Sequence, residues 1–166
     1  RVYPAEDEAD YARVAAIATI AKAVSDATGP EFQIGVQIML NALKASVAVA
    51  KVCDGSFLRC MALVGATLTN SGIVEANPLD FLNYRIRIGA QQVKLIVEVN
   101  SMHFRWMGDK PTVEVAGLAS RMGADAVEVA HPDESTNAAL VREIKQVFPH
   151  LPVILGGHTN HENVAR

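Results

Sequence analysis

Short apolar runs alternate along the chain with longer amphipathic stretches, and this alternation predicts β-strands separated by α-helices. The runs are rich in β-branched residues and do not alternate cleanly between apolar and polar positions. Such runs are typical of strands in a parallel sheet whose two faces are both covered. The predicted strands lie at residues 34–38, 57–64, 93–99, 126–130 and 152–155.

Local stop and start signals place helices before and between these strands. Asn77 followed by Pro78 combines an N-cap with a first-turn proline, and Gly89 ends the same helix. Asn41 is expected to cap the helix that follows the first strand. That helix is predicted at residues 42–53, and the remaining helices are predicted at residues 5–27, 111–122 and 136–148.

The lengths of the connections favour a barrel. Helix-to-strand connections such as residues 54–56 are tight, whereas the strand-to-helix connections at residues 65–77 and 100–110 are long. In (β/α)₈ barrels the loops after the strands carry the site. A doubly wound open sheet is the alternative, but it would need a phosphate loop after its first strand, and residues 37–41 contain no glycine.

We therefore predict one α/β domain over residues 1–166, of the (β/α)₈ TIM-barrel type with parallel strands, incomplete at about five strands. A complete barrel takes eight strands and about 250 residues. The open edges of a partial barrel would expose unpaired backbone groups. We expect either further strands in the full gene product or a partner that covers these edges.

Composition and charge limit the classes of function. The net charge is -3, so no basic field attracts nucleic acid, and no apolar run is long enough for a membrane span. Cys53 and Cys60 are too few for a disulfide framework and are expected to be reduced core thiols. These features indicate a soluble, intracellular protein, with the compartment unknown.

Glu98 and His103 lie at the end of the central predicted strand and just beyond it. A carboxylate and an imidazole there could act as base and acid at a barrel mouth. Glu98 could instead pair with Arg59 or Lys94 lining the barrel, with His103 capping a loop. Composition alone favours this second interpretation.

Gly156 and Gly157 follow the last predicted strand. Glycines let the backbone approach an anion, and a helix beginning there would offer free N–H groups, so the turn could hold phosphate. A tight turn before a helix, with Thr159 and Glu162 as its capping box, explains the same residues equally well.

Other polar positions leave alternatives open. His158 and His161 beside Glu162 are potential metal ligands, but their directions diverge where the chain turns, so we expect no metal. Residues 67–72 form a polar stretch that is either a lid or a surface loop. Arg105 and Trp106, in the other long loop, are expected to be exposed and are candidates for contact with a protein partner.

An ordered set of short stretches resembles the BtpA/SgcQ family. The stretches run over nearly the whole chain: Gly35-Val36-Gln37, Phe57-Leu58-Arg59, Val64-Gly65, residues 69–75, Tyr84-Arg85, Gly89-Ala90, Lys94, residues 123–126, Pro152-Val153 and residues 162–164. The resemblance implies a (β/α)₈ barrel, of which this chain supplies the third through seventh strands. It also implies similarity to phosphate-binding barrels, and one family member is linked to photosystem I biogenesis.

The departures from the family pattern fall on its site residues. Where the family usually reads Asp-x-His-x-Lys-His, this chain has Glu98, Asn100, Met102 and His103. Methionine cannot hold an anion, and asparagine cannot shuttle a proton. The family's Thr-Gly after the sixth strand appears as Ala130-His131, and its Gly-Ser-Gly phosphate turn as Gly156-Gly157-His158.

Two hypotheses of function follow. The first is a pseudoenzyme that acts as an interaction or assembly subunit of a larger complex or homo-oligomer, contacting protein partners through Arg105 and Trp106. The second is an enzyme that acts on a phosphorylated small metabolite and needs no cofactor. Its catalytic residues would be Glu98 and His103, and its phosphate-binding residues Arg59, Thr69, Gly156 and Gly157.

Overall fold

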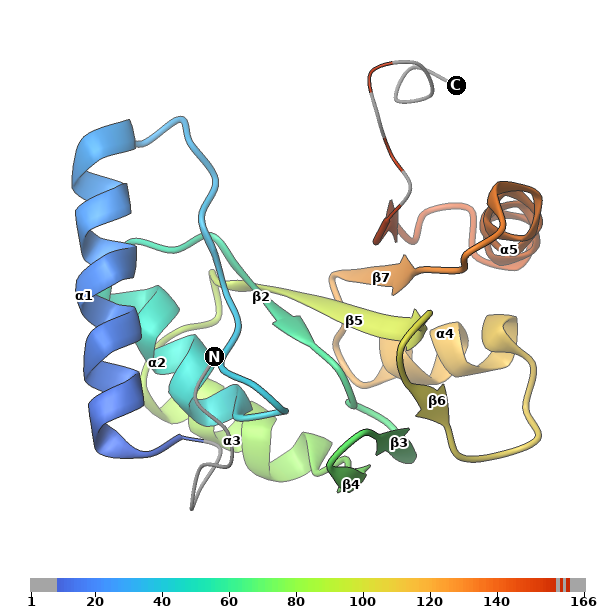
Figure 1. Ribbon diagram of the computed structural model, residues 1–166, viewed down its shortest axis with the longest axis horizontal. Coiled ribbons are helices and arrows are strands. Elements are labelled where there is room, and N and C mark those ends of the chain that lie inside the picture. Colours follow the sequence, from blue (N-terminus) through green and yellow to red (C-terminus); the bar gives the residue numbers. More distant parts are fainter. Residues whose placement is uncertain (1–8, 158, 160, 162–166) are drawn as a thin grey trace. The chain divides into compact units, whose positions relative to one another are not determined.

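The computed structural model describes residues 9–157, 159 and 161, and the chain in it forms two compact units (Figure 1). The first unit comprises Arg1–Cys60 and Asn77–Leu95, and the second comprises Met61–Ala76 and Ile96–Arg166. One domain over residues 1–166 stays a prediction.

Five strands form a parallel sheet in sequence order. The order is β1 (Gly35–Val36), β2 (Phe57–Cys60), β5 (Lys94–Asn100), β7 (Ala126–Val129) and β8 (Val153–Leu155). β1 runs parallel to β2, and β7 runs parallel to both β5 and β8. Strands in this order with helices between them confirm the predicted α/β fold, of the incomplete TIM-barrel type.

Four helices begin and end within two residues of their predicted positions, whereas the first begins at Tyr11 and not at residue 5; residues 5–8 of that prediction lie outside the described residues. The helices are α1 (Tyr11–Thr28), α2 (Leu43–Val52), α3 (Pro78–Arg87), α4 (Thr112–Arg121) and α5 (Glu134–Val147). In α3 the side chain of Asn77 accepts a hydrogen bond from the N–H of Asp80, and Pro78 occupies the first turn, as predicted.

The predicted cap of α2 is wrong. The N-cap residue is Ala42, which has no capping side chain. The chain enters the helix one residue later than expected, and the Asn41 side chain instead accepts a hydrogen bond from the Cys60 thiol, with Sγ and Oδ1 3.7 Å apart. The Ser46 hydroxyl accepts the N–H of Ile38 at 2.9 Å and so fixes the entry to the helix.

The core of the first unit lies between its strands and helices. Val36 and Leu58 are buried in adjacent strands, and Val47 is buried in α2, which packs on β2. The two cysteines are buried, as predicted, and neither of them is in a disulfide. Burial raises the pKa of the Cys53 thiol, which keeps it protonated at neutral pH.

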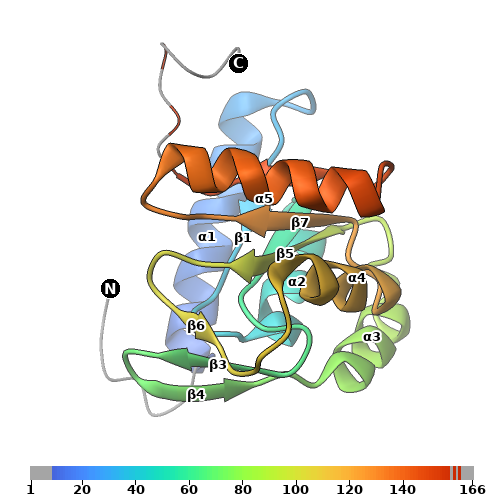
Figure 2. The ribbon, with the colours of Figure 1, turned by 90° about the vertical axis from the view of Figure 1, so that its right-hand side faces the viewer.

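The core of the second unit is formed by β5 from Ile96 onward, β7 and β8, with α4 and α5. Val97 and Val127 are fully or almost fully buried in register on neighbouring strands. α4 and α5 pack closely because Gly117 lacks a side chain, since a Cβ there would lie 2.5 Å from the Phe148 ring. Figure 2 shows α5 running along β7.

A second, antiparallel sheet occupies the two long strand-to-helix connections, where the sequence predicted only loops. Its strands are β3 (Ala66–Thr69), β4 (Gly72–Glu75) and β6 (Arg105–Trp106), in the order β4-β3-β6 (Figure 2). We call it the loop sheet. The prediction that one strand covers residues 57–64 is wrong, because β2 ends at Cys60 and the following residues lead into β3.

In the part of the chain that the structure describes, no helix combines the length and the apolar character needed to cross a membrane.

Candidate functional site

The inner face of the loop sheet is buried. Residues directly opposite each other on antiparallel strands project to the same face, and Thr67 lies opposite both Val74 and Trp106. Thr67 and Val74 are only 5% and 8% exposed. This face therefore anchors the loop sheet within the second unit.

Trp106 is half-buried, which corrects the expectation that it is exposed. Its indole N–H donates a hydrogen bond to the carbonyl oxygen of Val64 at 3.0 Å. A Cβ on Gly108 would lie 2.1 Å from the indole ring, and one on Gly65 would lie 3.0 Å from its nitrogen. Trp106 therefore fixes the two connections to each other, because two glycines leave room for its ring.

The outer face of the loop sheet is apolar at its centre and exposed. Leu68, Ile73 and Met107 are 46%, 56% and 45% exposed. Ile73 and Arg105 lie opposite Leu68 on either side, and the N–H of Met107 continues the pairing by donating to the Ala66 carbonyl. Arg105 is also exposed, and among the described residues its guanidinium has no partner. We call Leu68, Ile73, Arg105 and Met107 the outer face.

The structure does not bring Glu98 and His103 into one described pocket. Glu98 is 9% exposed on β5, and its partner in register on β7 is Glu128, which is 5% exposed. His103 is exposed and lines a pocket of about 360 Å³ that is bounded by residues 68–70 and 102–105. The base and acid pairing that an enzyme would need stays a prediction.

Two side chains lie close to the glycine turn, and phosphate binding there stays a prediction. A Cβ on Gly156 would lie 2.0 Å from a carboxylate oxygen of Glu128, and a Cβ on Gly157 would lie 2.4 Å from the terminal methyl group of Met102. The N–H of Gly156 already donates to the carbonyl of Val129 at 2.9 Å. An acidic oxygen and a methyl group therefore border the turn, and neither attracts phosphate.

The remaining phosphate candidates have local hydrogen bonds. The hydroxyl of Thr69 donates to the carbonyl of Gly72 at 2.8 Å and accepts the N–H of Ser71 at 3.1 Å, which stabilises the β3–β4 turn. Arg59 lies on β2 in the first unit, where it donates to the side-chain oxygen of Gln37 at 3.4 Å. Neither observation tests whether these residues bind phosphate.

The last predicted helix and its surroundings lie mostly outside the described residues, which include neither His158 nor Glu162. Among those that are described, no three His, Cys, Asp or Glu side chains gather closely enough to hold a metal ion. His131, which stands where the family has glycine, caps a turn: its Nδ1 accepts the N–H of Asp133 at 3.0 Å.

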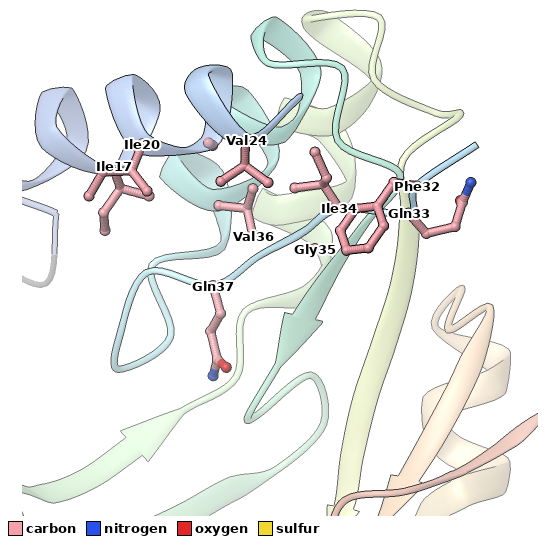
Figure 3. Close-up of a pocket in the computed structure, with 10 residues that line it drawn as sticks. Ile17, Ile20, Val24, Phe32, Gln33, Ile34, Gly35, Val36 and Gln37 are labelled. Atoms are coloured by element: carbon pink, nitrogen blue, oxygen red, sulfur yellow. The ribbon is translucent and has the colours of Figure 1, made fainter. Parts of the chain in front are cut away.

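The first unit carries an apolar groove that the sequence analysis missed. The groove has a volume of about 390 Å³ and lies between α1 and residues 32–37. Figure 3 shows Ile20 and Val24 of α1 on the side that faces this segment. Ile20 and Phe32 are 64% and 56% exposed, and β1 is an edge strand of the sheet. The available signal was the apolar stripe of the first helix.

Comparison with known proteins identifies the family. Residues 2–166 match the model of the BtpA family, and the chain therefore belongs to that family. This confirms the resemblance found in the sequence.

The relatives are distant and longer. The chain is 29% identical to an uncharacterized protein of Thermococcus kodakarensis over 161 residues, which cover 94% of this chain and 59% of the relative. A Methanocaldococcus jannaschii protein, also uncharacterized, is 26% identical over 97% of this chain and 60% of its own length. The photosystem I biogenesis protein BtpA of Synechocystis is 27% identical over 57% of this chain and 33% of its own. No solved structure matches the chain.

Proposed function

We propose that this member of the BtpA family is an interaction subunit that binds a protein partner through the outer face of its loop sheet. The observation that carries the proposal is the exposed row of Leu68 and Ile73 beside Arg105. Apolar side chains flanked by an arginine are typical of the centre of a protein interface. The complementary partner surface is apolar and carries a carboxylate for the guanidinium.

The support for the loop sheet makes this face suitable for docking. Trp106 is bonded to Val64 behind it, and Thr67 and Val74 are buried on the inner side. A face held in one conformation loses little conformational entropy on binding. In this proposal Arg105 contacts the partner directly, while Trp106 acts mainly as the support of the face.

The glycine turn favours an interaction role over phosphate chemistry. The carboxylate of Glu128 adjoins Gly156, and the methyl group of Met102 adjoins Gly157. An anion at this turn would therefore meet an acidic side chain and an apolar one, and neither donates a hydrogen bond to phosphate. The Synechocystis relative is named for photosystem I biogenesis, which agrees with an assembly role. The chain spans about 60% of the length of the two archaeal relatives described above. What the whole protein binds is therefore part of this proposal.

The proposal is tested with the full-length protein isolated gently from its own cells. We expect one partner at fixed stoichiometry, measured by light scattering and mass spectrometry. The double variant Leu68→Ser, Ile73→Ser should weaken binding at least tenfold, because it removes both apolar contacts. The matched control is Val147→Ser, which changes another apolar residue that is 59% exposed in the same unit.

Two outcomes would overturn the proposal. One is binding that is unaffected by the double variant yet lost in the control. The other is a protein without partners that turns over a phosphorylated metabolite and loses this activity on Glu98→Gln, which would establish the enzyme hypothesis instead.

A further inference from the structure

A pocket adjoins one end of the outer face in the second unit. It has a volume of about 360 Å³ and lies between the β3–β4 turn and the loop that precedes β6. Asn70 lines it from the turn, His103 lines it from the loop, and Arg105 lines it from the start of β6. No acidic residue is among the residues that line this pocket.

The polar side chains of the pocket are available to a ligand. Asn70, His103 and Arg105 are all exposed, and none of their side chains has a hydrogen-bond or ion-pair partner among the described residues. A guanidinium offers five N–H donors, an amide offers two, and an imidazole offers at least one when neutral. Donors of this kind without a neighbouring carboxylate form a site for an anion.

The backbone that carries these donors is held in place. The hydroxyl oxygen of Ser101 accepts the N–H groups of both His103 and Phe104 at 3.2 Å. The rings of His103 and Phe104 meet edge to face, with centroids 6.3 Å apart. Arg105 belongs to β6, which pairs with Leu68 of β3. The pocket is therefore organised before any ligand arrives.

We propose that Asn70, His103 and Arg105 bind one oxyanion group, a carboxylate or a phosphate. The residues that line this pocket do not include Gly156 or Gly157; its donors come from the β3–β4 turn, the loop before β6 and β6 itself. The anion has two possible sources, a free small molecule or an acidic side chain of the partner. Only the second source rests on the proposed docking function. In that case an acidic side chain of the partner supplies the carboxylate that contacts Arg105.

The test is a titration of the purified full chain with inorganic phosphate and, separately, with acetate, followed by two-dimensional amide NMR. Ionic strength is held constant with chloride. We expect saturable shifts confined to amides of residues 69–71 and 102–105. Arg105→Gln should weaken binding about tenfold, because charge-assisted bonds are lost, and His103→Gln should weaken it less. Arg121→Gln, an exposed arginine on α4, is the control and should change nothing.

Arg105→Lys keeps the charge but loses the planar guanidinium, and we expect its affinity for the anion to be intermediate between those of wild type and Arg105→Gln.

Shifts that fail to saturate, or that are equal in wild type and Arg105→Gln, would overturn the site. Saturation by phosphate alone indicates a phosphorylated small molecule, and competition of both anions with the partner indicates a partner carboxylate. Anion binding that survives Leu68→Ser, Ile73→Ser while partner binding is lost separates this site from the docking face.

Discussion

At the residue scale, the glycine turn has a structural explanation that the family pattern does not suggest. Gly156 leaves space for the buried carboxylate of Glu128, whose oxygen would be 2.0 Å from an added Cβ. Gly157 adjoins only the flexible end of Met102. Neighbouring glycines thus differ in what a methyl group would displace.

This difference gives the first prediction. Gly156→Ala should destabilise the protein by about 1–3 kcal/mol, because a buried carboxylate must move to admit the methyl group. Gly157→Ala should cost less than about 1 kcal/mol, because the Met102 methyl group can rotate away. Urea denaturation of both variants measures the difference. Equal losses would show that Glu128 does not restrict this position.

Trp106 shows where residue-level prediction failed. The sequence places it in a long connection, and such connections normally run over the surface. Its burial depends on the nearby Gly108 and also on the distant Gly65 and the carbonyl of Val64, so it becomes apparent only once the connections pair.

Trp106→Phe is the second prediction. The change keeps a large ring but removes the donor to Val64, and we expect a loss of about 1 kcal/mol in stability. Partner binding should fall less than in the Leu68→Ser, Ile73→Ser variant, because Trp106 supports the outer face from behind. Thermal unfolding and partner titration, done on the same samples, check both statements. A larger loss of binding in Trp106→Phe would make its indole a direct contact.

At the element scale, signals that lie within a few residues predicted the fold well. The Asn77-Pro78 start of α3 is confirmed because a cap and a fixed proline φ act locally. The β3–β4 hairpin also had a local signal, an alternation of apolar and polar residues before Asn70-Ser71 and a pair of β-branched residues after it, but its polarity suggested a loop. β6 is two residues long and is a strand only because it pairs with β3, so no local pattern could predict it.

The cap of α5 gives the third prediction. Asp133 accepts hydrogen bonds from both the N–H and the hydroxyl of Thr136, each at 2.7 Å. Asp133→Ala should lower the melting temperature by roughly 2–4 °C, whereas Asp133→Asn, which still caps, should lower it less. Circular dichroism melting curves of the three proteins at neutral pH compare them. A larger loss for Asn than for Ala would contradict the cap.

The same residue predicts a pH dependence. Hydrogen bonds from the hydroxyls of Ser135 and Thr136, and from the Thr136 N–H, hold the pKa of Asp133 well below its usual range. Because the folded pKa is lowered, the stabilisation is fully present above the unfolded pKa of about 3.9 and is lost as the pH falls through the folded value. The stability advantage of wild type over Asp133→Asn should therefore shrink below about pH 4. An advantage that grows on acidification would show that the carboxylate is not stabilised.

At the scale of the whole molecule, the order of the five parallel strands could be predicted, but the residues that the long connections bring together could not. His103 and Glu98 are five positions apart, yet one is exposed in a loop and the other is buried on β5. Asn70 and Arg105 are 35 positions apart and line one pocket. The register between β3 and β6 brings these two residues to the same pocket, and that register depends on tertiary packing.

The last prediction concerns the sheet edge in the first unit. Among the described strands, β1 has a neighbour on one side only, and the groove beside it exposes Ile20 and Phe32. A strand with one unpaired edge next to apolar side chains can accept another strand, because backbone hydrogen bonds and apolar burial then both favour association. We therefore expect the isolated 166-residue chain to associate, with a mass above 17.8 kDa by light scattering at micromolar concentration.

Ile20→Ser combined with Phe32→Ser should shift that mass towards the monomer, while the control Leu79→Ser, which changes an apolar residue 69% exposed in the same unit, should leave it unchanged. Hydrogen exchange of the Gly35 and Val36 amides should be slow in the associated form and faster in the double variant, because pairing protects edge amides. A stable 17.8 kDa monomer with slowly exchanging β1 amides would show that this edge needs no cover. It would also remove the reason to expect a further strand or a partner there.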